Sequence, residues 1–520
     1  MRKDVRPRPF DRILVANRGE IALRIIRTCR DLGVEVVAVY SDADVDAAHV
    51  AAADTSIRLG PAPPGESYLL ADAIVEAALS SGAQAVHPGY GYLSERAAFA
   101  RSVEDAGLTF VGPRPDAIDA LGDKLAARRT AASADVPVVP GTFEPLETDR
   151  ADAVGGVIAE AERIGFPLFV KAAAGGGGRG MRRVTEARDL PGAIAAGAAE
   201  ARAAFGDGAI YLEREIRPAR HIEVQLLGDA AGSVVALGER DCSIQRRHQK
   251  LVEESPAPGL TQDERAAVQA LAVRAARAVG LHNAATAEFL FDSNRQFWFL
   301  EVNARLQVEH GVTELVTDLD LVAEQLWIAA GEPLSEAVHA AAAAALEPTR
   351  HAIEVRLAAE DPSREFGPVP GRIGDWVMPS GPGIRVDSAI RPGDRVPSDY
   401  DPMIAKVMAV GPDRSAAIGR LRRALDEVVV SGIQTTLPFD RALLRDPRFD
   451  EASGAALSTD WVTERWDGAA DRARAREVAV IAAARAASAA SAAPSLRKDD
   501  PLLSAWTRAG REAMVDRWPR

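Results

Sequence analysis

Glu288 and Glu301 are spaced so that they can face each other across a β-hairpin. Residues 286–303, TAEFLFDSNRQFWFLEVN, are typical of two strands joined by a turn, and a turn centred just after Asn294 pairs the two glutamates. Facing carboxylates with Cβ atoms about 5 Å apart repel each other, so we expect a cation between them. Asn303 on the same face adds a neutral oxygen, and this donor set suits a hard cation such as Mg²⁺. An exposed acidic pair is the alternative, and a bulge would break the register, but the apolar FLF and FWFL runs favour a buried metal site.

A polar stripe continues beyond this hairpin in the segment NARLQVEH. Arg305, Gln307 and Glu309 stand at every second position, which predicts one shared face of an extended segment. Together they can hold a small planar anion, with arginine and glutamine as donors and glutamate as an acceptor or proton-taking base. Such residues also decorate edge strands, but the neighbouring metal site favours anion binding.

Lysine occupies only six of the 62 Lys and Arg positions, so arginine serves wherever charge alone matters. A lysine that remains is expected where a compact ammonium is needed and a rigid guanidinium would not fit. We therefore predict site-specific roles for Lys124, Lys171, Lys250 and Lys406, and none for the two lysines near the ends.

A glycine run, GGGGRG at 175–180, follows a strand that carries Lys171. Glycine backbone can approach phosphate oxygens closely, and a flexible glycine loop can close over a substrate. A tight loop without function is the alternative, since the run matches neither the P-loop pattern nor G-x-G-x-x-G. With the magnesium site and the anion stripe nearby, the run favours an enzyme that handles a nucleotide.

The elements that must position these residues are of the α/β type. Residues 13–40 alternate strand, amphipathic helix and strand, and this pattern continues to about residue 113. We expect five segments: an α/β domain at 1–113, a helical connector at 114–136, a glycine-loop unit at 137–214, a larger α+β unit at 215–465 and an alanine-rich linker or exposed helix with a tail at 466–520.

The larger unit is expected to begin with a hairpin, HIEVQLLG returning through VVALGERDCSIQ. Alternation in its first strand places His221, Glu223 and Gln225 on one polar face. Helices are predicted at 262–279 and, as one long helix closed by a glycine, at 313–330.

Composition bounds the class of protein. A chain of 520 residues with 47% hydrophobic and 26% charged residues predicts several globular domains. The net charge of −13 argues against a broad nucleic-acid or anionic-membrane surface, so basic function is expected only within a pocket. Cys29 and Cys242 allow no disulfide framework, and no stretch of about 20 apolar residues is present, so we expect a cytoplasmic protein that does not span a membrane.

Several motifs in order resemble the biotin carboxylase branch of the ATP-grasp enzymes, as found in acetyl- and propionyl-CoA carboxylases. They are ANRGEIALRI, HPGYGYLSE, GDK, KAAAGGGGRGM, RHIEVQ, ERDCSIQRRHQK, EVNARLQVEH and EVRLAAEDP, and they span about residues 10–460. The resemblance implies an ATP-grasp fold with an N-terminal Rossmann-like domain, a small glycine-loop lid domain and a larger α+β C-terminal domain.

The resemblance also implies a role for each matching residue. ATP, with its adenine between the lid and the third unit, would be contacted by Lys124, Lys171, Gly175, Gly176, Gly177, Gly178, Met181, Glu213, Arg214, Ile216, His221, Gln245, His248, Glu288 and Glu301. Mg²⁺ or Mn²⁺ would be held by Glu288, Glu301 and Asn303. Bicarbonate would be held by Lys250, Arg305, Gln307 and Val308, and Glu309 would remove its proton. Arg305 and Arg356 would stabilise the biotin enolate.

The implied reaction is the first half-reaction of an acyl-CoA carboxylase. Bicarbonate attacks the γ-phosphate of ATP to give carboxyphosphate, which yields CO₂ and phosphate, and the phosphate then deprotonates biotin. No Met-Lys pair is present for biotin attachment, so the resemblance implies a separate biotin carboxyl carrier protein, a separate carboxyltransferase subunit, and a homodimer or larger complex. Docking to those partners is our hypothesis for the end segment WTRAGREAMVDRW, residues 506–518.

Three positions depart from the family pattern. Ala304 replaces a usual Thr, Gly311 a usual Pro and Arg214 a common Lys. Losing the Pro is expected to loosen the turn after Glu309. The alternatives to biotin carboxylation are another ATP-grasp ligase that forms an acyl phosphate for amine attack, and a nucleotide-binding scaffold subunit without turnover.

Overall fold

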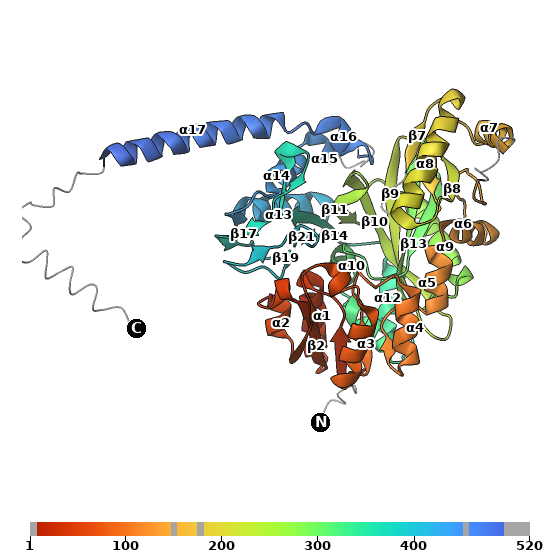
Figure 1. Ribbon diagram of the computed structural model, residues 1–520, viewed down its shortest axis with the longest axis horizontal. Coiled ribbons are helices and arrows are strands. Elements are labelled where there is room, and N and C mark those ends of the chain that lie inside the picture. Colours follow the sequence, from red (N-terminus) through yellow and green to blue (C-terminus); the bar gives the residue numbers. More distant parts are fainter. Residues whose placement is uncertain (1–7, 147–152, 174–180, 451–456, 493–520) are drawn as a thin grey trace, which may run out of the picture. The chain divides into compact units, whose positions relative to one another are not determined.

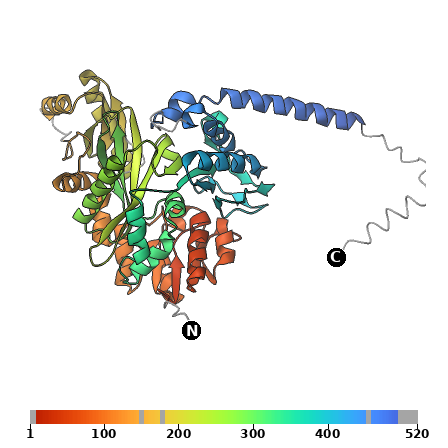
Figure 2. The ribbon, with the colours of Figure 1, turned by 180° about the vertical axis from the view of Figure 1, so that it is seen from behind.

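The computed structural model describes residues 8–146, 153–173, 181–450 and 457–492 (Figures 1 and 2). The chain forms two compact units, Met1–Trp466 and Asp467–Arg520. In the second unit, helix α17 (Ala469–Ala492) exposes all of its described side chains, in agreement with the exposed helix expected there. No helix in the described ranges combines the length and the apolar character needed to cross a bilayer.

The N-terminal part is built on a parallel sheet of five strands in the order β3-β2-β1-β4-β5. The strands are β1 (Arg12–Val15), β2 (Glu35–Ser41), β3 (Thr55–Gly60), β4 (Ala85–His87) and β5 (Thr109–Phe110). The connecting helices are α1 (Gly19–Asp31), α2 (Ala48–Ala52), α3 (Ala71–Ser80) and α4 (Ala97–Asp105). Gly33 adopts φ +72°, which lets the chain leave α1 and enter β2. The expected strand–helix–strand opening is confirmed.

A small antiparallel sheet, in the order β7-β6-β8, follows two connecting helices. These elements are α5 (Pro115–Gly122), α6 (Lys124–Ser133), α7 (Ala153–Ile164), β6 (Leu168–Ala172), β7 (Arg182–Val184), α8 (Leu190–Phe205) and β8 (Ile210–Arg214). The side chain of Asp123 caps α6 by accepting hydrogen bonds from the backbone of Leu125 and Ala126, so Lys124 stands at the first position of that helix. Apolar side chains of α7, α8 and the three strands form one local core.

The rest of the first unit is organised by an antiparallel sheet of eight strands, in the order β13-β12-β9-β10-β11-β14-β21-β19. These strands are β9 (Ala219–Gly228), β10 (Val234–Arg246), β11 (Gln249–Ser255), β12 (Asn283–Asp292), β13 (Phe297–Asn303), β14 (His351–Ala358), β19 (Ile384–Asp387) and β21 (Met403–Gly411). Its helices are α9 (Gln262–Ala278), α10 (His310–Thr317), α11 (Leu321–Ala329), α12 (Glu336–Ala344), α13 (Arg414–Glu427), α14 (Leu437–Leu444), α15 (Pro447–Asp450) and α16 (Trp461–Arg465). Short pairs complete the unit: β15 (Glu360–Asp361) with β16 (Gly367–Pro368), β17 (Gly371–Arg372) with β20 (Arg395–Val396), and β18 (Trp376–Val377) with β22 (Val429–Val430).

The single long helix predicted over 313–330 is wrong. The segment forms two helices, α10 and α11, because Asp318 ends the first one in the left-handed region at φ 57°. Asp320 then begins the second by accepting a hydrogen bond from the backbone of Ala323. The left-handed residue turns the chain, which the apolar periodicity of the sequence does not record.

The hairpin of β12 and β13 pairs Glu288 with Glu301, as predicted. The turn itself is centred on Asn294, half a residue before the predicted point, since Phe291 pairs with Phe297 and Phe289 with Phe299. A bulge at Leu300 shifts the register by one residue and brings the two glutamates opposite each other. The bulge therefore restores the pairing that it was expected to break.

Candidate functional site

A cavity of about 650 Å³ lies between the small sheet and the eight-stranded sheet. Its lining brings together most of the residues singled out from the sequence: Lys124, Lys171, Met181, Glu213, Arg214, Ile216, His221, Gln245, His248, Lys250, Glu288, Glu301, Asn303, Arg305, Gln307, Val308 and Arg356. Glu309 is fully buried behind the lining residue Val308. Gly175, Gly176, Gly177 and Gly178 lie outside the described residues.

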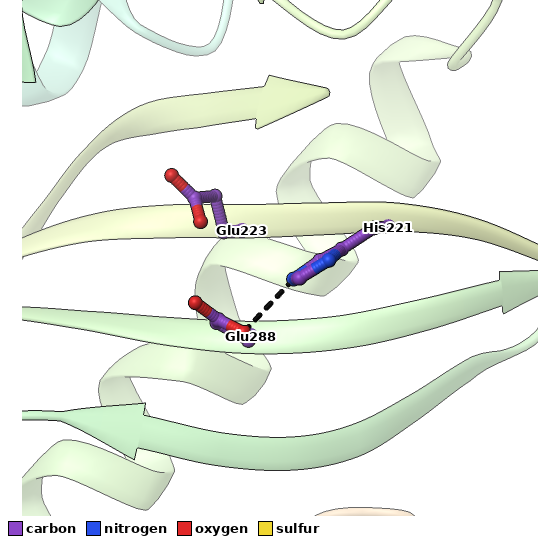
Figure 3. Close-up of side chains that lie close together, drawn as sticks. All are labelled: His221, Glu223 and Glu288. Atoms are coloured by element: carbon purple, nitrogen blue, oxygen red, sulfur yellow. Dashed lines mark ion pairs between the residues drawn. The ribbon is translucent and has the colours of Figure 1, made fainter. Parts of the chain in front are cut away.

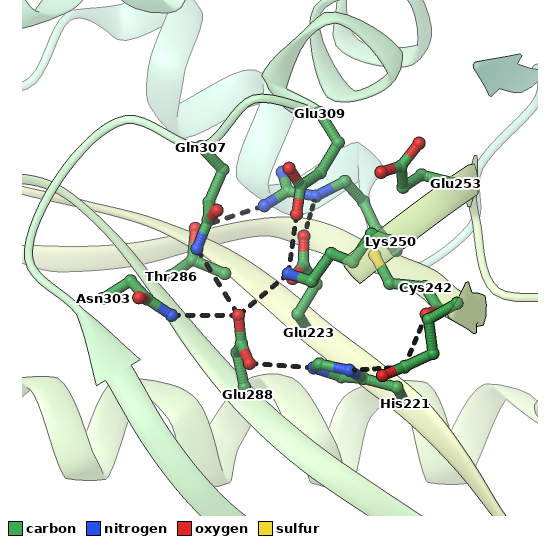
Figure 4. A network of polar contacts seen from close by, with 12 residues as sticks. His221, Glu223, Cys242, Lys250, Glu253, Thr286, Glu288, Asn303, Gln307 and Glu309 are labelled. Atoms are coloured by element: carbon green, nitrogen blue, oxygen red, sulfur yellow. Dashed lines mark hydrogen bonds and ion pairs between the residues drawn. The ribbon is translucent and has the colours of Figure 1, made fainter. Parts of the chain in front are cut away.

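Lys250 is the hub of the polar network in this cavity (Figure 4). Its ammonium lies 2.5 Å from Glu223, 2.9 Å from Glu288 and 2.7 Å from Glu309. Burial disfavours a charged lysine, but the three carboxylates outweigh this cost and hold the pKa of Lys250 well above its usual value. Lys250 is thus a fixed cation that joins carboxylates from β9, β12 and the start of α10.

His221 forms a second ion pair with the carboxylate of Glu288. Figure 3 shows His221 and Glu223 on one strand and Glu288 on the next. His221 Nε2 lies 2.9 Å from Glu288 Oε2, and His221 Nδ1 lies 3.2 Å from the amide of Gln245. Burial opposes the charged ring, but Glu288 outweighs it and raises the pKa of His221. The same ion pairs lower the pKa of Glu288, against the opposing effect of its burial.

Glu288, Glu301 and Asn303, the ligands proposed for a metal, lie in one cavity, but Asn303 does not turn its oxygen toward Glu288. Glu288, Glu301 and Asn303 all line the cavity, and the Glu301 side chain is 39% exposed with Lys124 3.8 Å away. The amide nitrogen of Asn303 points to Glu288 at 2.9 Å, and its oxygen accepts from Arg305 at 3.2 Å. A metal at Glu288 would lie near the Lys250 ammonium, and the Asn303 amide would have to turn to offer its oxygen, but two carboxylates and an amide oxygen are a suitable set.

On the small-sheet side, Lys171 and Glu213 form a second charged pair. Lys171 binds Glu213 Oε1, and Arg128 donates to Glu213 Oε2 at 2.8 Å. Burial opposes ionisation of Glu213, but Lys171 and Arg128 outweigh it and lower its pKa. Arg128 is almost fully buried, so it orders Glu213, which in turn holds Lys171 at the cavity wall.

The predicted anion stripe is a loop rather than an extended strand. β13 ends at Asn303, and Glu309 stands at the N-cap position of α10. Arg305 is held by Glu95 at 2.9 Å and by the Gln307 oxygen at 2.9 Å. The loop still brings Arg305 and Gln307 to the cavity, although their alternation comes from turns and not from a pleated strand.

Glu309 is held between two cations beneath this loop. Lys250 donates to its Oε1 at 2.7 Å and Arg356 to its Oε2 at 2.9 Å. Burial opposes ionisation of Glu309, but Lys250, Arg356 and Arg240 outweigh it and hold the pKa of Glu309 well below its usual range. The carboxylate is therefore ionised and able to accept a proton.

Several residues that build the site were missed from the sequence. Glu95 lies in the HPGYGYLSE motif and fixes Arg305, while Glu223 was placed on the polar face of its strand without a role. Arg240 is fully buried and binds Glu223 together with Gln225, Thr286 and Thr313. Residues such as Arg240 stand out because a charged side chain is seldom fully buried unless it is paired. Burial is not visible in the sequence, so nothing there singled them out.

Lys406 and Gly311 lie beside Glu309, and Ala304 begins the loop that leads to it. Lys406 is fully buried and donates to the carbonyl of Val308 at 2.8 Å, a site-specific role of the kind predicted for the rare lysines. Ala304 donates its backbone N–H to Glu95 at 3.2 Å. At Gly311, the second residue of α10, a Cβ atom would lie 2.4 Å from the sulfur of Met408.

Comparison with known proteins agrees along the whole first unit. Three family descriptions match in order: "Biotin carboxylase, N-terminal domain" at 9–118, "Carbamoyl-phosphate synthase L chain, ATP binding domain" at 123–337 and "Biotin carboxylase C-terminal domain" at 354–464. The biotin carboxylase of Allochromatium vinosum is 47% identical over 440 residues, which are 85% of this chain and 96% of that protein. A pyruvate carboxylase subunit from Methanothermobacter thermautotrophicus is 44% identical over 88% of this chain and 90% of its own length.

Solved structures show the same relationship. The biotin carboxylase of Campylobacter jejuni in a β,γ-ATP complex has a TM-score of 0.82 and 42% identity, and covers 88% of this chain and 99% of that one. The biotin carboxylase domain dimer of Hydrogenobacter thermophilus 2-oxoglutarate carboxylase, solved with MgADP, ADP and bicarbonate, has a TM-score of 0.81 and 41% identity over 88% and 97% of the two chains.

Proposed function

The chain belongs to the biotin carboxylase family, and from that premise we propose which of its residues carry the reaction and with which partners it acts. It is an ATP-dependent ligase that performs the biotin carboxylation half-reaction of a carboxylase, with Mg²⁺, bicarbonate and carrier-bound biotin. One observation supports the assignment of its residues most directly. The ammonium of Lys250 joins Glu309, the proposed base, to Glu288, a proposed metal ligand, within one cavity.

We assign nucleotide binding to the residues that face the cavity from both sheets. Lys124 and Lys171 place two ammonium groups on its wall, suited to phosphate oxygens, and Met181 and Ile216 add apolar surface for a base. Glu288, Glu301 and Asn303 would hold Mg²⁺, which when bound neutralises phosphate charge during transfer. Glu213 keeps Lys171 in place through the ion pair that Arg128 completes.

Bicarbonate fits beside Arg305, Gln307 and Lys250, where two cations can balance its charge. Glu309 is ionised and can take the bicarbonate proton on a carboxylate oxygen. The low pKa of Glu309 depends on Lys250 and Arg356, so a bound anion that draws these cations away would raise that pKa and make Glu309 a stronger base. Attack of bicarbonate on the γ-phosphate of ATP would give carboxyphosphate and ADP. Arg305 and Arg356 would stabilise the biotin enolate.

Biotin carboxylases act with a carrier and a carboxyltransferase, and we propose that both are separate chains here, in an acyl-CoA carboxylase. This proposal is supported by the three family matches, which describe biotin carboxylase and ATP-binding domains, and by the biotin carboxylase of Allochromatium vinosum, 96% of whose length the match covers. We also propose that the chain forms a homodimer or larger complex in the cytoplasm and that the five segments defined above are its domains. Residues 506–518, which lie outside the described residues, are proposed to dock to the partner chains. Two free, buried cysteines suit a reducing compartment.

The test is bicarbonate-dependent ATP cleavage with and without free biotin. We expect biotin to stimulate it, and Glu309→Gln to lower kcat by about 10²–10⁴-fold while ADP binding persists. Glu35→Gln, which removes one partner of a surface ion pair with Arg12, is the control and should act as the unaltered protein. Biotin-independent turnover with an amine acceptor, or full activity of the Glu309 variant, would contradict the proposal.

A further inference from the structure

Two glutamates that the reaction does not use face each other beneath helix α10. Glu253 of β11 and Glu354 of β14 are directly paired across the antiparallel ladder. Opposed residues have Cβ atoms about 5 Å apart, so their carboxyl groups can meet on one face of the sheet. Both side chains are fully buried; Glu253 Oε1 contacts Arg356, whereas Glu253 Oε2 and both Glu354 oxygens have no hydrogen-bond partner among the described residues.

Arg356 connects this pair to the proposed base. One guanidinium nitrogen of Arg356 lies 2.6 Å from Glu253 Oε1 and 2.9 Å from Glu309 Oε2. Glu354 and Arg356 are two residues apart on β14, so they share the face that α10 covers. Met408 pairs with Glu354 on β21, and Glu354 Oε2 lies 3.4 Å from the Cβ position of Gly311. The cation that acts most strongly on Glu354 is the buried ammonium of Lys406 on β21.

Burial and mutual repulsion disfavour ionisation of both glutamates at once, and the nearby Lys406 ammonium already lies 3.3 Å from Glu20 and 3.9 Å from Asp387. Two adjacent buried carboxylates repel strongly, and the nearest guanidinium is already shared with Glu309. Burial, in balance with Arg356 and Glu309, raises the pKa of Glu253 to about 7. Burial together with Glu253 outweighs the opposing effect of Lys406 and raises the pKa of Glu354 well above its usual value. The charged and titratable groups that face the pair come from each packed element: Arg356 on β14, Lys406 on β21, Lys250 on β11, Cys242 on β10 and Glu309 at the start of α10.

We propose that Glu253 and Glu354 share one proton and together act as a positioning pair that holds Arg356 against Glu309. Glu354 keeps the proton and donates it in a hydrogen bond to Glu253, whose remaining charge fixes the guanidinium. Loss of the shared proton would place a second negative charge beside Arg356 and draw it away from Glu309 and from biotin. The inference rests on the proposed roles of Glu309 and Arg356 and deepens them.

The first experiment tests the positioning role by kinetics. Glu354→Gln keeps a neutral donor, so biotin-dependent turnover near pH 7 should stay within about threefold, a change below 1 kcal/mol in barrier. Glu253→Gln removes the anion, so the same turnover should fall about tenfold or more and KM for biotin should rise. Above neutral pH, the unaltered protein should lose activity as the shared proton leaves, and Glu354→Gln should lack that decline.

The second experiment tests the shared proton without activity. The infrared difference spectrum between the unaltered protein and Glu354→Gln should show the loss of one carbonyl band of a protonated, buried carboxylic acid, whereas Asp440, whose pKa burial also raises, contributes equally to both proteins. Glu254→Gln is the matched control, because Glu254 is the buried neighbour on β11 whose pKa is lowered to about 2, so its loss should leave the band. Retention of ADP binding by Glu253→Gln shows that the variant is folded.

The outcomes separate the two proposals. If the unaltered protein cleaves ATP in a biotin-dependent way but Glu253→Gln is equally active, the positioning role is wrong. If Glu354→Gln loses no carboxylic acid band relative to the unaltered protein, the shared proton is wrong. If the unaltered protein shows no biotin-dependent cleavage, the proposed function of the site fails, and the infrared result still decides whether the pair holds a proton.

Discussion

The ammonium of Lys250 lies 2.9 Å from Oε1 of Glu288, on the carboxylate proposed to bind magnesium. Two cations at one carboxylate oxygen repel each other, so a metal bound there would push the Lys250 ammonium away from Glu288. The released ammonium then has Glu223 and Glu309 as remaining partners and is free to turn toward an anion. In this way, filling the metal site would prepare the anion site beside it.

This competition predicts the behaviour of Lys250→Met. Mn²⁺ binding with ADP should be retained or become tighter, because the cation that competes for Glu288 is gone. Bicarbonate-dependent ATP cleavage should fall by a factor of about 10–100, since a charged hydrogen bond contributes ~1.5–3 kcal/mol. Isothermal titration with Mn²⁺ and ADP, beside steady-state kinetics, measures both quantities.

Arg350→Met is the control for Lys250→Met. Arg350 forms a surface ion pair with Asp318 and does not line the cavity, so neither metal binding nor turnover should change. Weaker Mn²⁺ binding in Lys250→Met than in this control would show that the two cations do not compete.

Stability in acid is expected to depend on Glu254. Its carboxylate accepts from Arg414 at 2.7 Å and lies 2.8 Å from the ring of His351. Burial opposes ionisation, but the Arg414 guanidinium and the hydrogen bond with His351 outweigh it and lower the pKa of Glu254 to about 2. A carboxyl with a lowered folded pKa stabilises the fold above its unfolded pKa of about 4.3 and loses that contribution as the pH falls toward 2.

Glu254→Gln should therefore lower the melting temperature at pH 7, and the difference from the unaltered protein should shrink as the pH falls below about 4.3. The shift in pKa corresponds to ~3 kcal/mol at neutral pH. Glu427→Gln, from a surface pair with Arg423, is the control and should change stability by less than ~1 kcal/mol. The pH range from about 7 to about 3.5 spans the unfolded pKa of about 4.3. A difference in melting temperature between Glu254→Gln and the unaltered protein that stays constant over this range would contradict the assignment.

The hairpin shows how far the sequence alone could predict the site. Alternating apolar residues fix which faces Glu288 and Glu301 share, so their pairing was predictable. The bulge at Leu300 was not, since it depends on how the turn closes around Arg295 in the left-handed region at φ 61°. The pairing was thus predicted correctly although the turn was misplaced.

The polar network behind the cavity was beyond prediction for a different reason. Arg240 reaches Thr313, which is 73 residues away in the chain, and Arg305 reaches Glu95 over 210 residues. Contacts of this kind depend on how separate layers pack, and single-sequence periodicity reports only the local face of each residue. The residues on the cavity wall were predictable from motifs, while the residues that hold them in place were not.

Gly311 and Met408 are predicted to be energetically coupled beneath Glu309. A Cβ atom at Gly311 would lie 2.4 Å from the Met408 sulfur, and Met408 is fully buried, so it cannot move into solvent. Gly311→Ala should therefore destabilise the protein, because overpacking costs ~1–3 kcal/mol and the better helix propensity of Ala returns only ~1 kcal/mol.

Truncating the Met408 side chain, which the added methyl group would strike, should relieve this strain. Met408→Ala alone leaves a cavity and should cost ~2–5 kcal/mol. In the double variant, however, the midpoint of urea unfolding should fall by less than the two single shifts together, with a coupling of ~1 kcal/mol. Strictly additive midpoints would show that the Gly311 contact does not determine the packing. Because α10 begins at His310, directly after Glu309, Gly311→Ala should also lower biotin-dependent turnover, and Met408→Ala should restore part of it.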